Sequence, residues 1–416
     1  MRQLCENRQV VITGLGIISC LGLDCQQVQE SLRLGRSGIA LLPERKERGF
    51  RSALSGVIHG FDNSGLERRY RKNMPEFGQW AWASVEQALA QAGLSARDLA
   101  GDERCGLLFG NDSSVVTGVE QCRVLAEAGE SRGIGSGHIF RLLNSTITLN
   151  LATKLQLHGS SWTVSGACAS GAMAIGQAAE LISSGKQDRM ICGGAQEISW
   201  QSMCSFDGLG AFSLREDAPA AASRPFDAGR DGLVPSGGAA ALVLEEKQHA
   251  LQRGAPILAE IEAYAATSDG HHVSVPSGEG LGRAMAMALQ QADLAAADID
   301  LVMAHATSTQ VGDAKEALAL RHLFGVDQGQ AGPVIAATKA LTGHEFWMAG
   351  ASQVVYGLLM SQGGFVAGHS NFQEADASAR GLRIPPQTME LHPRRLLCNA
   401  SGFGGVNAAL VVRVAP

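Results

Sequence analysis

Short apolar runs rich in β-branched residues alternate along this chain with longer, Ala-rich stretches in which apolar positions recur with helical spacing. In the first half, the pattern predicts strands at residues 105–110 and 189–193 and helices at 79–92 and 172–184. In the second half, it predicts strands at 257–264, 301–304 and 334–338 and helices at 282–292 and 314–324. This alternation is typical of an α/β protein whose sheets are covered by helices on both faces.

Two similar halves are indicated by segments 237–244 and 404–412, which both begin with paired glycines and continue as apolar strands. Because no low-complexity linker separates the halves, we expect one body with two similar cores, residues 1–255 and 256–416, and a site between them. At the start of the chain, residues 10–23 are interrupted by three glycines, which favours a buried first strand and a turn over a cleaved signal. No apolar run of about 20 residues follows, which predicts no membrane insertion.

The composition is that of a large globular protein. The 416 residues are 45% hydrophobic and 18% charged, and 51 glycines indicate many tight turns. A formal net charge of -6 predicts no general attraction to nucleic acid, so an acidic partner would need a local basic patch. Nine scattered cysteines, an odd number without a Cys-x-x-Cys pair, predict a reduced, cytoplasmic protein, and no metal-ligand spacing is present.

Cys168 stands in VSGACASG at residues 164–171, where a β-branched start gives way to small residues and then to helical spacing. A thiol on such a strand-to-helix turn is exposed to substrate, and the positive end of the helix dipole favours its thiolate. By itself, however, a cysteine among Ala, Ser and Gly is more often a small buried apolar residue than a nucleophile. Its role depends on the rest of the chain.

Three further segments place polar residues at predicted strand-to-helix turns, where α/β folds usually carry ligand chemistry. They are AHATST at 304–309, TKALTGH at 338–344 and NASGFGGVN at 399–407. Either histidine alone, His305 or His344, is more often a capping or buried structural residue. A catalytic site is favoured by the ordered set that these segments form with Cys168: a cysteine on a strand-to-helix turn, two histidines on later turns, a nearby lysine and a Gly-Phe-Gly-Gly turn. The turn that carries Cys168 is called the elbow below.

With these motifs the sequence resembles the β-ketoacyl-acyl-carrier-protein synthases, the condensing enzymes of fatty acid and polyketide synthesis, and especially the elongating ketosynthases of bacteria. The resemblance runs from VVITGLG at 10–16 through ASRPFD at 222–227 and RDG at 230–232 to Val411. It implies a duplicated, thiolase-like fold, layered α/β/α/β/α with two mixed sheets, and a homodimer. The activity it implies is decarboxylative Claisen condensation of an acyl-carrier-protein thioester with malonyl carrier protein, which gives β-ketoacyl carrier protein.

The resemblance also implies a role for each motif residue. Cys168 would take the acyl group as a thioester, through nucleophilic attack by its thiolate. His305 and His344 would hold the thioester carbonyl of malonyl carrier protein and stabilise the negative charge that develops when carbon dioxide leaves. Both rings would be neutral, because two imidazolium groups would repel each other. The backbone N–H groups of Cys168 and Phe403 match the family's oxyanion hole, and the Phe403 side chain matches its gate.

Lys339 and Glu316 match a charged pair that supports the histidine geometry in the family, with Lys339 counted in the catalytic set. Asp313 belongs to the same cluster. An ordinary buried salt bridge is the alternative interpretation of these charges, and we expect support of the histidines rather than direct proton transfer.

Other residues match positions that bind the carrier. Thr307 and Thr309 match residues that bond the phosphopantetheine arm of the carrier protein, and no bound cofactor is implied. In the basic run RRYRK at 68–72, Arg69 and Lys72 match a docking patch for acidic carrier protein. A solvated helix face is the alternative interpretation of that run.

The chain departs from the family's pattern around the acyl pocket. After His344 the family usually continues with small residues, whereas Trp347 and Met348 stand here, and Ser401 replaces the usual Phe before the Gly-Phe-Gly-Gly turn. Residues 110–114 replace a more glycine-rich loop, and Phe206 matches a pocket-lining aromatic. Such exchanges can preserve packing volume while reshaping a pocket. We therefore expect a dedicated acyl substrate, as in secondary pathways such as aryl polyene assembly.

A chain-length factor is the alternative function. Such proteins share the fold as non-catalytic partners of a ketosynthase, but they usually lack the nucleophilic cysteine. The presence of Cys168 together with both histidines favours an enzyme. Heterodimerisation with a chain-length factor stays open, as do the acyl starter and its length.

Overall fold

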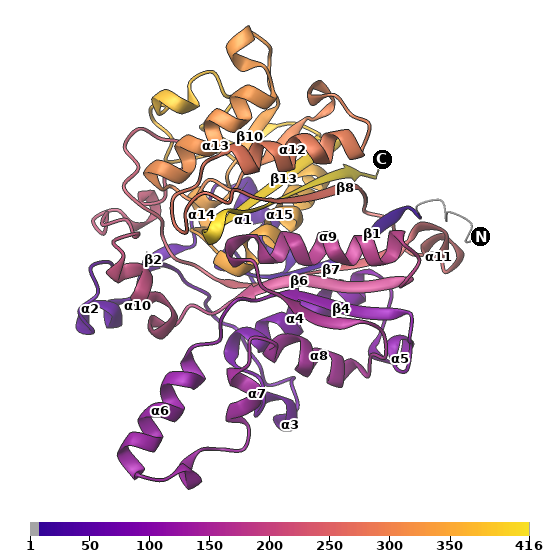
Figure 1. The fold of residues 1–416 in the computed structure, drawn as a ribbon, viewed down its shortest axis with the longest axis vertical. Helices are drawn as coiled ribbons and strands as arrows, with labels where there is room; N and C mark the ends of the chain where they lie inside the picture. Colours follow the sequence, from indigo (N-terminus) through magenta and orange to yellow (C-terminus); the bar gives the residue numbers. More distant parts are fainter. Residues whose placement is uncertain (1–7, 416) are drawn as a thin grey trace.

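Ten strands form one mixed sheet in the computed structural model, which describes residues 8–415 (Figure 1). Their spatial order is β10-β9-β13-β14-β8-β1-β7-β6-β4-β5. The strands are β1 (Val10–Ile18), β4 (Cys105–Gly110), β5 (Ser161–Val164), β6 (Arg189–Gln196), β7 (Gly238–Glu246), β8 (Ala259–Ser268), β9 (Leu301–Met303), β10 (Val334–Ala336), β13 (Arg395–Gly402) and β14 (Val406–Val414). Two small pairs are β2 (Ile39–Leu41) with β3 (Leu54–Gly56) and β11 (Phe365–Val366) with β12 (Met389–Glu390).

The two halves of the large sheet have the same topology. Each half contributes five strands, which can be numbered by their order in the chain. From the outer edge of the sheet to its centre, both halves then have the order third, second, fourth, fifth, first. The two first strands, β1 and β8, pair antiparallel, with Val10 opposite Ile261 and Ile12 opposite Ala259. The expected two sheets are therefore joined into one, because each first strand satisfies backbone groups that the other would leave unpaired. The predicted α/β fold class is confirmed, and the division at residues 255 and 256 stays a prediction.

Helices cover both faces of each half-sheet and make five layers (Figure 1). The outer layer of the first half has α4 (Glu76–Gln91) and α8 (Thr146–Leu155), and that of the second half has α12 (Glu279–Gln291) and α13 (Gln310–Leu323). Between the half-sheets lie α9 (Ser170–Ser183) and α15 (Ala349–Gly363). Alternate residues of β7 enter the outer and the central core, so the strand is apolar throughout. The remaining helices are α1 (Cys25–Arg33), α2 (Pro43–Glu47), α3 (Arg68–Arg71), α5 (Ala96–Leu99), α6 (Val116–Ala128), α7 (His138–Leu142), α10 (Trp200–Gly208), α11 (Lys247–Gln252) and α14 (Lys339–Thr342).

The first strand contains two of the glycines that interrupt its apolar run. A Cβ on Gly14 would lie 2.0 Å from the carbonyl oxygen of Ala88, and one on Gly16 would lie 1.9 Å from that of Ser84. Both contacts are with α4, so these glycines bring the helix directly onto the strand. Among residues 8–415, no helix has the length and apolar character needed to cross a bilayer.

The central helices approach each other closely beside the elbow cysteine. A Cβ on Gly171 of α9 would lie 2.8 Å from the backbone nitrogen of Ala351, and one on Gly350 of α15 would lie 2.5 Å from that of Ala172. These glycines allow near backbone contact, which brings the turn before α9 beside the turn before α15. The fold thus places Cys168 and His344 on adjoining turns.

Candidate active site

Cys168 lies on a tight turn between edge strand β5 and helix α9. Ala167 has a φ of 47°, in the left-handed region that L-residues rarely adopt. The Ser170 hydroxyl accepts a hydrogen bond from the N–H of Gly166 at 2.9 Å and donates one to the carbonyl of Ala167 at 2.6 Å. These two hydrogen bonds hold the strained turn, and the Cys168 side chain lines a cavity.

Both predicted histidines lie beside this cysteine. The Nε2 atom of His344 is 3.1 Å from the Sγ atom of Cys168. The ring of His305, which follows β9, lies edge-on to that of His344 with centroids 5.3 Å apart. Three turns that are far apart in the sequence thus bring one sulfur and two imidazoles together.

Burial controls the protonation of this group. Burial, assisted by the nearby Lys339 cation, holds the pKa values of His305 and His344 well below the usual value of 6.5. Burial also raises the pKa of Cys168 to about 12, and the Lys339 cation opposes that shift. Both imidazoles are therefore neutral, as the sequence predicted. Burial thus favours the thiol form of the resting cysteine and opposes the thiolate that the helix dipole was expected to favour.

Glu316 on α13 positions the His305 turn. Its carboxylate accepts hydrogen bonds from the backbone N–H groups of His305 at 2.8 Å and Ala306 at 2.7 Å, and from the side-chain amide of Asn399 at 2.7 Å. Burial raises the pKa of Glu316. Asp313, one turn earlier, accepts the N–H of Phe226 at 2.9 Å, and burial raises its pKa to about 7.

The structure corrects the expectation that Lys339 and Glu316 form a charged pair. Within the described chain no ion pair joins them, and the Lys339 ammonium donates to the amide oxygen of Gln353 at 3.1 Å. Gln353 in turn donates to the carbonyl oxygens of Met303, Ala304 and Asn399. Burial lowers the pKa of Lys339 to about 8. Because Lys339 forms its hydrogen bond with Gln353 on α15, it influences the Glu316 carboxylate through the longer-range attraction between their charges.

Glu345 is a buried acid that the sequence reasoning missed. Its carboxylate accepts hydrogen bonds from Ser352 at 2.5 Å and from the Tyr356 hydroxyl at 2.6 Å, both on α15. Burial raises the pKa of Glu345 to about 7, and the Lys339 cation opposes the shift. The signal available in the sequence was a Glu directly after His344 with hydroxyl residues seven and eleven positions later.

The Gly-Phe-Gly-Gly turn, residues 402–405, packs against the turn that carries Cys168. Gly404 and Gly405 have φ values of 81° and 75°, which suit glycine. The Phe403 side chain is 43% exposed and stacks on Phe206, with ring centroids 5.9 Å apart. The Ser401 hydroxyl bonds Asn407 at 2.8 Å and faces the same cavity.

A cavity of about 450 Å³ contains this chemistry. Cys168, His305 and His344 line it, together with these other predicted residues: Thr307, Thr309, Phe206, Ser401 and Phe403. The hydroxyls of Thr307 and Thr309 lie 3.1 Å apart. Trp347 and Met348 do not line the cavity.

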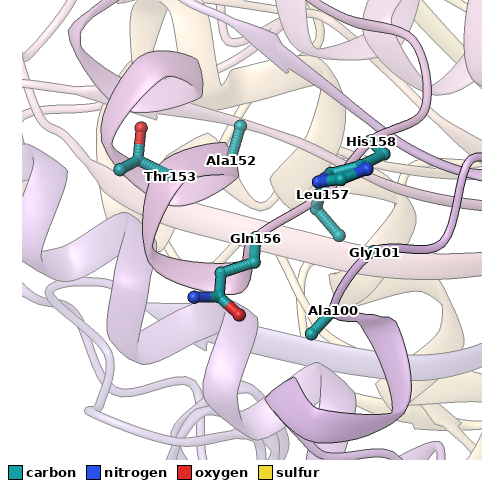
Figure 2. Close-up of a pocket in the computed structure, with 7 residues that line it drawn as sticks. All are labelled: Ala100, Gly101, Ala152, Thr153, Gln156, Leu157 and His158. Carbon is teal, nitrogen blue, oxygen red and sulfur yellow. The ribbon is translucent and has the colours of Figure 1, made fainter.

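The predicted docking residues lie elsewhere, on and just after α3. Arg69 pairs with Glu67 at 3.0 Å, and the Lys72 ammonium donates to Ser136 at 3.0 Å. Neither lines the cavity. A second hollow, between α5 and the end of α8, is lined by His158 as its one titratable residue and by no cysteine (Figure 2). The chemistry thus gathers in the Cys168 cavity.

Comparison with known proteins agrees with this geometry. A family model described as "Beta-ketoacyl synthase, N-terminal domain" matches residues 7–250, and the corresponding C-terminal domain model matches residues 258–373. The 3-oxoacyl-[acyl-carrier-protein] synthase 1 of Escherichia coli K12 is 42% identical over 98% of this chain and 99% of its own length. That of Haemophilus influenzae is 39% identical over 98% and 99%.

Solved structures give the same result. A β-ketoacyl synthase from Burkholderia phymatum superimposes with a TM-score of 0.92 at 33% identity, covering 98% of this chain and 100% of that one. A second solved structure is AntDE:AntF, a type II polyketide synthase acyl carrier protein in complex with its ketosynthase. It has a TM-score of 0.87 at 29% identity, covering 98% and 100%.

The chain therefore belongs to the β-ketoacyl synthase family. It is a β-ketoacyl synthase, an enzyme that forms carbon–carbon bonds by decarboxylative condensation in fatty acid or polyketide elongation, as the sequence predicted.

Gly402 provides a test of the contact between the two turns. A Cβ there would lie 2.8 Å from the carbonyl oxygen of Gly166 and 3.1 Å from the nitrogen of Cys168. We expect Gly402→Ala to push the turns apart and to lower the rate of Cys168 acylation roughly 100-fold, because small misplacements of reacting groups have such effects. Single-turnover mass spectrometry measures this rate. Gly208→Ala, where a Cβ meets open space, is the matched control. Equal loss in both variants would contradict the expectation.

Proposed function

We propose that Cys168 carries the growing acyl group and that His305 and His344 drive decarboxylation of the malonyl partner. The observation that supports this assignment is the 3.1 Å contact between Cys168 and His344, with His305 beside it, in one cavity. The acyl donor and the malonyl group arrive on the phosphopantetheine arm of an acyl carrier protein. Thr307 and Thr309 offer their hydroxyls to the amides of that arm.

In the first half-reaction, the Cys168 sulfur attacks the thioester carbonyl of the donor. A bond forms between this sulfur and the acyl carbon, the bond to the pantetheine sulfur breaks, and the thiol proton ends on that departing sulfur. The backbone N–H groups of Cys168 and Phe403 hold the oxygen while it is negative. The products are acyl-Cys168 and free pantetheine thiol.

In the second half-reaction, the malonyl carboxylate leaves as carbon dioxide and its electron pair forms an enolate. The neutral rings of His305 and His344 donate hydrogen bonds to the enolate oxygen. The enolate carbon attacks acyl-Cys168, the carbon–sulfur bond breaks, and the cysteine sulfur takes a proton from solvent. Glu316 and Lys339 support the histidines by position and charge. Asp313 holds the neighbouring chain at Phe226.

Acyl-transfer assays test the proposed function. Purified protein is mixed with acyl carrier proteins bearing acetyl, butyryl, octanoyl or palmitoyl groups, and then with malonyl carrier protein. Mass spectrometry follows the peptide that contains Cys168 and the carrier-bound product. We expect acylation at Cys168 and a β-ketoacyl product with at least one donor. Failure of every donor to acylate Cys168 would overturn the assignment.

The depressed histidine pKa values predict the pH dependence of condensation. Because both rings stay neutral well below pH 6.5, lowering the pH from 6.5 to 5.5 leaves their N–H donors intact, and Lys339, with a pKa of about 8, stays charged throughout. We expect the condensation rate of pre-acylated enzyme to stay within about twofold over this range, measured by carbon dioxide release. An acid limb with its midpoint near 6.5 would show that one ring protonates during turnover.

We infer a dimer formed through the β5 edge of the sheet. This edge strand carries the exposed Trp162. Helices α6 and α7 project from the same half of the body, as Figure 1 shows, and present further exposed apolar residues. These residues are Val119 and Leu125 on α6, Ile139 and Phe140 on α7, and Leu143 directly after α7. An unpaired strand beside apolar surface suits a second copy of the chain. A chain-length factor would cover the same surface.

Substitution of the edge tryptophan tests the dimer. Trp162→Asp places a charge on the inferred interface, and we expect the apparent mass in sedimentation to fall from dimer to monomer. Leu251→Asp, at an exposed leucine on α11, is the control and keeps the dimer. A monomeric wild-type protein, or a dimer that persists in Trp162→Asp, would contradict the inference.

The basic residues Arg69 and Lys72 remain our proposed contacts for the acidic carrier protein, supported by their exposure on and after α3. We also propose a cytoplasmic location, because the eight cysteines among the described residues are free. Cys5 lies outside the described residues. The narrower assignment to an aryl polyene pathway stays a prediction.

A further inference from the structure

Trp347 is packed into the wall of apolar side chains around the nucleophile. The cluster that contains Cys168 also contains Phe50, Met203, Phe212, Leu233, Phe346 and Trp347. Only 8% of Trp347 is exposed, and its indole N–H donates to the Ser113 hydroxyl at 3.1 Å. The indole therefore has apolar neighbours around its rings and a polar anchor at its nitrogen.

The backbone of Trp347 is confined as well. Its carbonyl oxygen lies 2.8 Å from the Cβ position of Gly194 on β6 and 3.0 Å from that of Gly171 on α9, so only glycines allow this approach. The preceding Phe346 has a φ of 41°, a strained value held by this packing. The backbone therefore cannot move toward β6 or α9 to make room behind Cys168.

The anchor of the indole is held in turn by the elbow. Residues 110–114, which carry Ser113, begin with the last residue of β4. The backbone N–H of Asn111 donates to the carbonyl oxygen of Val164, four residues before the nucleophile, at 3.1 Å. The Asp112 carbonyl oxygen accepts a hydrogen bond from the Asn144 side-chain amide at 3.0 Å. The loop, the elbow and the indole thus form one connected unit.

The cavity reaches Cys168 and Phe346 but neither Trp347 nor Ser113. A line of aromatic rings leads from the cavity lining to the indole, with centroid distances of 5.9 Å from Phe403 to Phe206, 4.7 Å from Phe206 to Phe346 and 5.7 Å from Phe346 to Trp347. Phe346 and the indole pack with Cys168 in one apolar cluster. An acyl chain attached to Cys168 would have to displace them to extend.

Resting on the proposed function, we propose that Trp347, positioned by Ser113, is the fixed end wall of the acyl site and limits it to short acyl groups of acetyl to butyryl size. Longer chains are excluded because they must both break the indole hydrogen bond and disrupt the packed cluster. Met348 has no such role, because its side chain belongs to the central core between the half-sheets.

The test compares acylation rates of Cys168 with acetyl and octanoyl carrier proteins, by mass spectrometry. We expect the wild type to favour acetyl at least tenfold, and Trp347→Ala to raise the octanoyl-to-acetyl ratio at least tenfold. Ser113→Ala leaves the indole without its anchor, so a smaller rise in the same direction is expected. Met348→Leu, in the central core, keeps the wild-type ratio.

The outcomes separate the two proposals. A wild type that accepts octanoyl as fast as acetyl, or a Trp347→Ala ratio equal to that of the wild type, overturns the end wall while leaving the proposed function in place. No acylation with either donor overturns the proposed function itself. If Trp347→Ala fails to fold in a thermal melt, Trp347→Leu fills more of the space and must still raise the ratio.

Discussion

Replacing Cys168 with alanine is expected to abolish acyl transfer, with a fall of at least about 1,000-fold in the condensation rate. The reason is that Cys168 is the one thiol among the residues that line the cavity. The hydroxyls that line it, those of Ser274, Thr307, Thr309 and Ser401, remain protonated at neutral pH and are weaker nucleophiles. Mass spectrometry of the intact protein after incubation with acyl carrier protein measures the covalent intermediate.

Cys204→Ala is the matched control for this experiment, because Cys204 is exposed on α10 and does not line the cavity. It should acylate at the wild-type rate. Decarboxylation of malonyl carrier protein by Cys168→Ala should continue, since both histidines stay in place. Acylation of Cys168→Ala at another residue would move the nucleophile and contradict the assignment.

The two histidines are expected to differ when each is replaced by alanine. His344 contacts the Cys168 sulfur, whereas no hydrogen bond joins His305 to that atom in the described structure. We therefore expect His305→Ala to keep Cys168 acylation within a few-fold of wild type and to slow decarboxylation roughly 100- to 1,000-fold, the usual effect of losing one charge-stabilising donor. His344→Ala should slow both steps.

Separate assays distinguish the two steps. Single-turnover acylation is followed by mass spectrometry, and carbon dioxide release is measured with enzyme that is already acylated. His322→Ala, at an exposed histidine of α13, serves as the control and should change neither rate. If His305→Ala slowed acylation as strongly as decarboxylation, the division of labour drawn from the geometry would be wrong.

Much of the fold could be predicted where local periodicity is strong. The strand at Cys105–Gly110 has the predicted bounds, and predicted helix 79–92 corresponds to α4 (Glu76–Gln91). Helix α15 was missed because it is buried on every side, so its apolar residues show no helical period. The pair α6 and α7 was missed because apolar residues on its exposed face blur the same signal.

The reacting groups of the candidate site could be predicted from the sequence, but the residues that hold them in place could not. Cys168, His305 and His344 stand out because their residue types and turns are readable in the sequence. Lys339 was assigned to Glu316, yet Gln353 occupies its hydrogen-bonding position from α15. Glu345 was overlooked because a Glu after the histidine is indistinguishable from a surface residue until α15 covers it.

Taken alone, the sequence determined the alternation of strands and helices and the duplication, because these depend on spacing and on residue type, and its resemblance to a known family implied the kind of chemistry. Only the tertiary structure decided which groups hold one another, because the partners come from distant segments: Ser113 meets Trp347 across a separation of 234 residues. The tight turn after His344 also directs neighbouring side chains to different places. Trp347 packs behind the nucleophile, while Met348, the next residue, enters the central core.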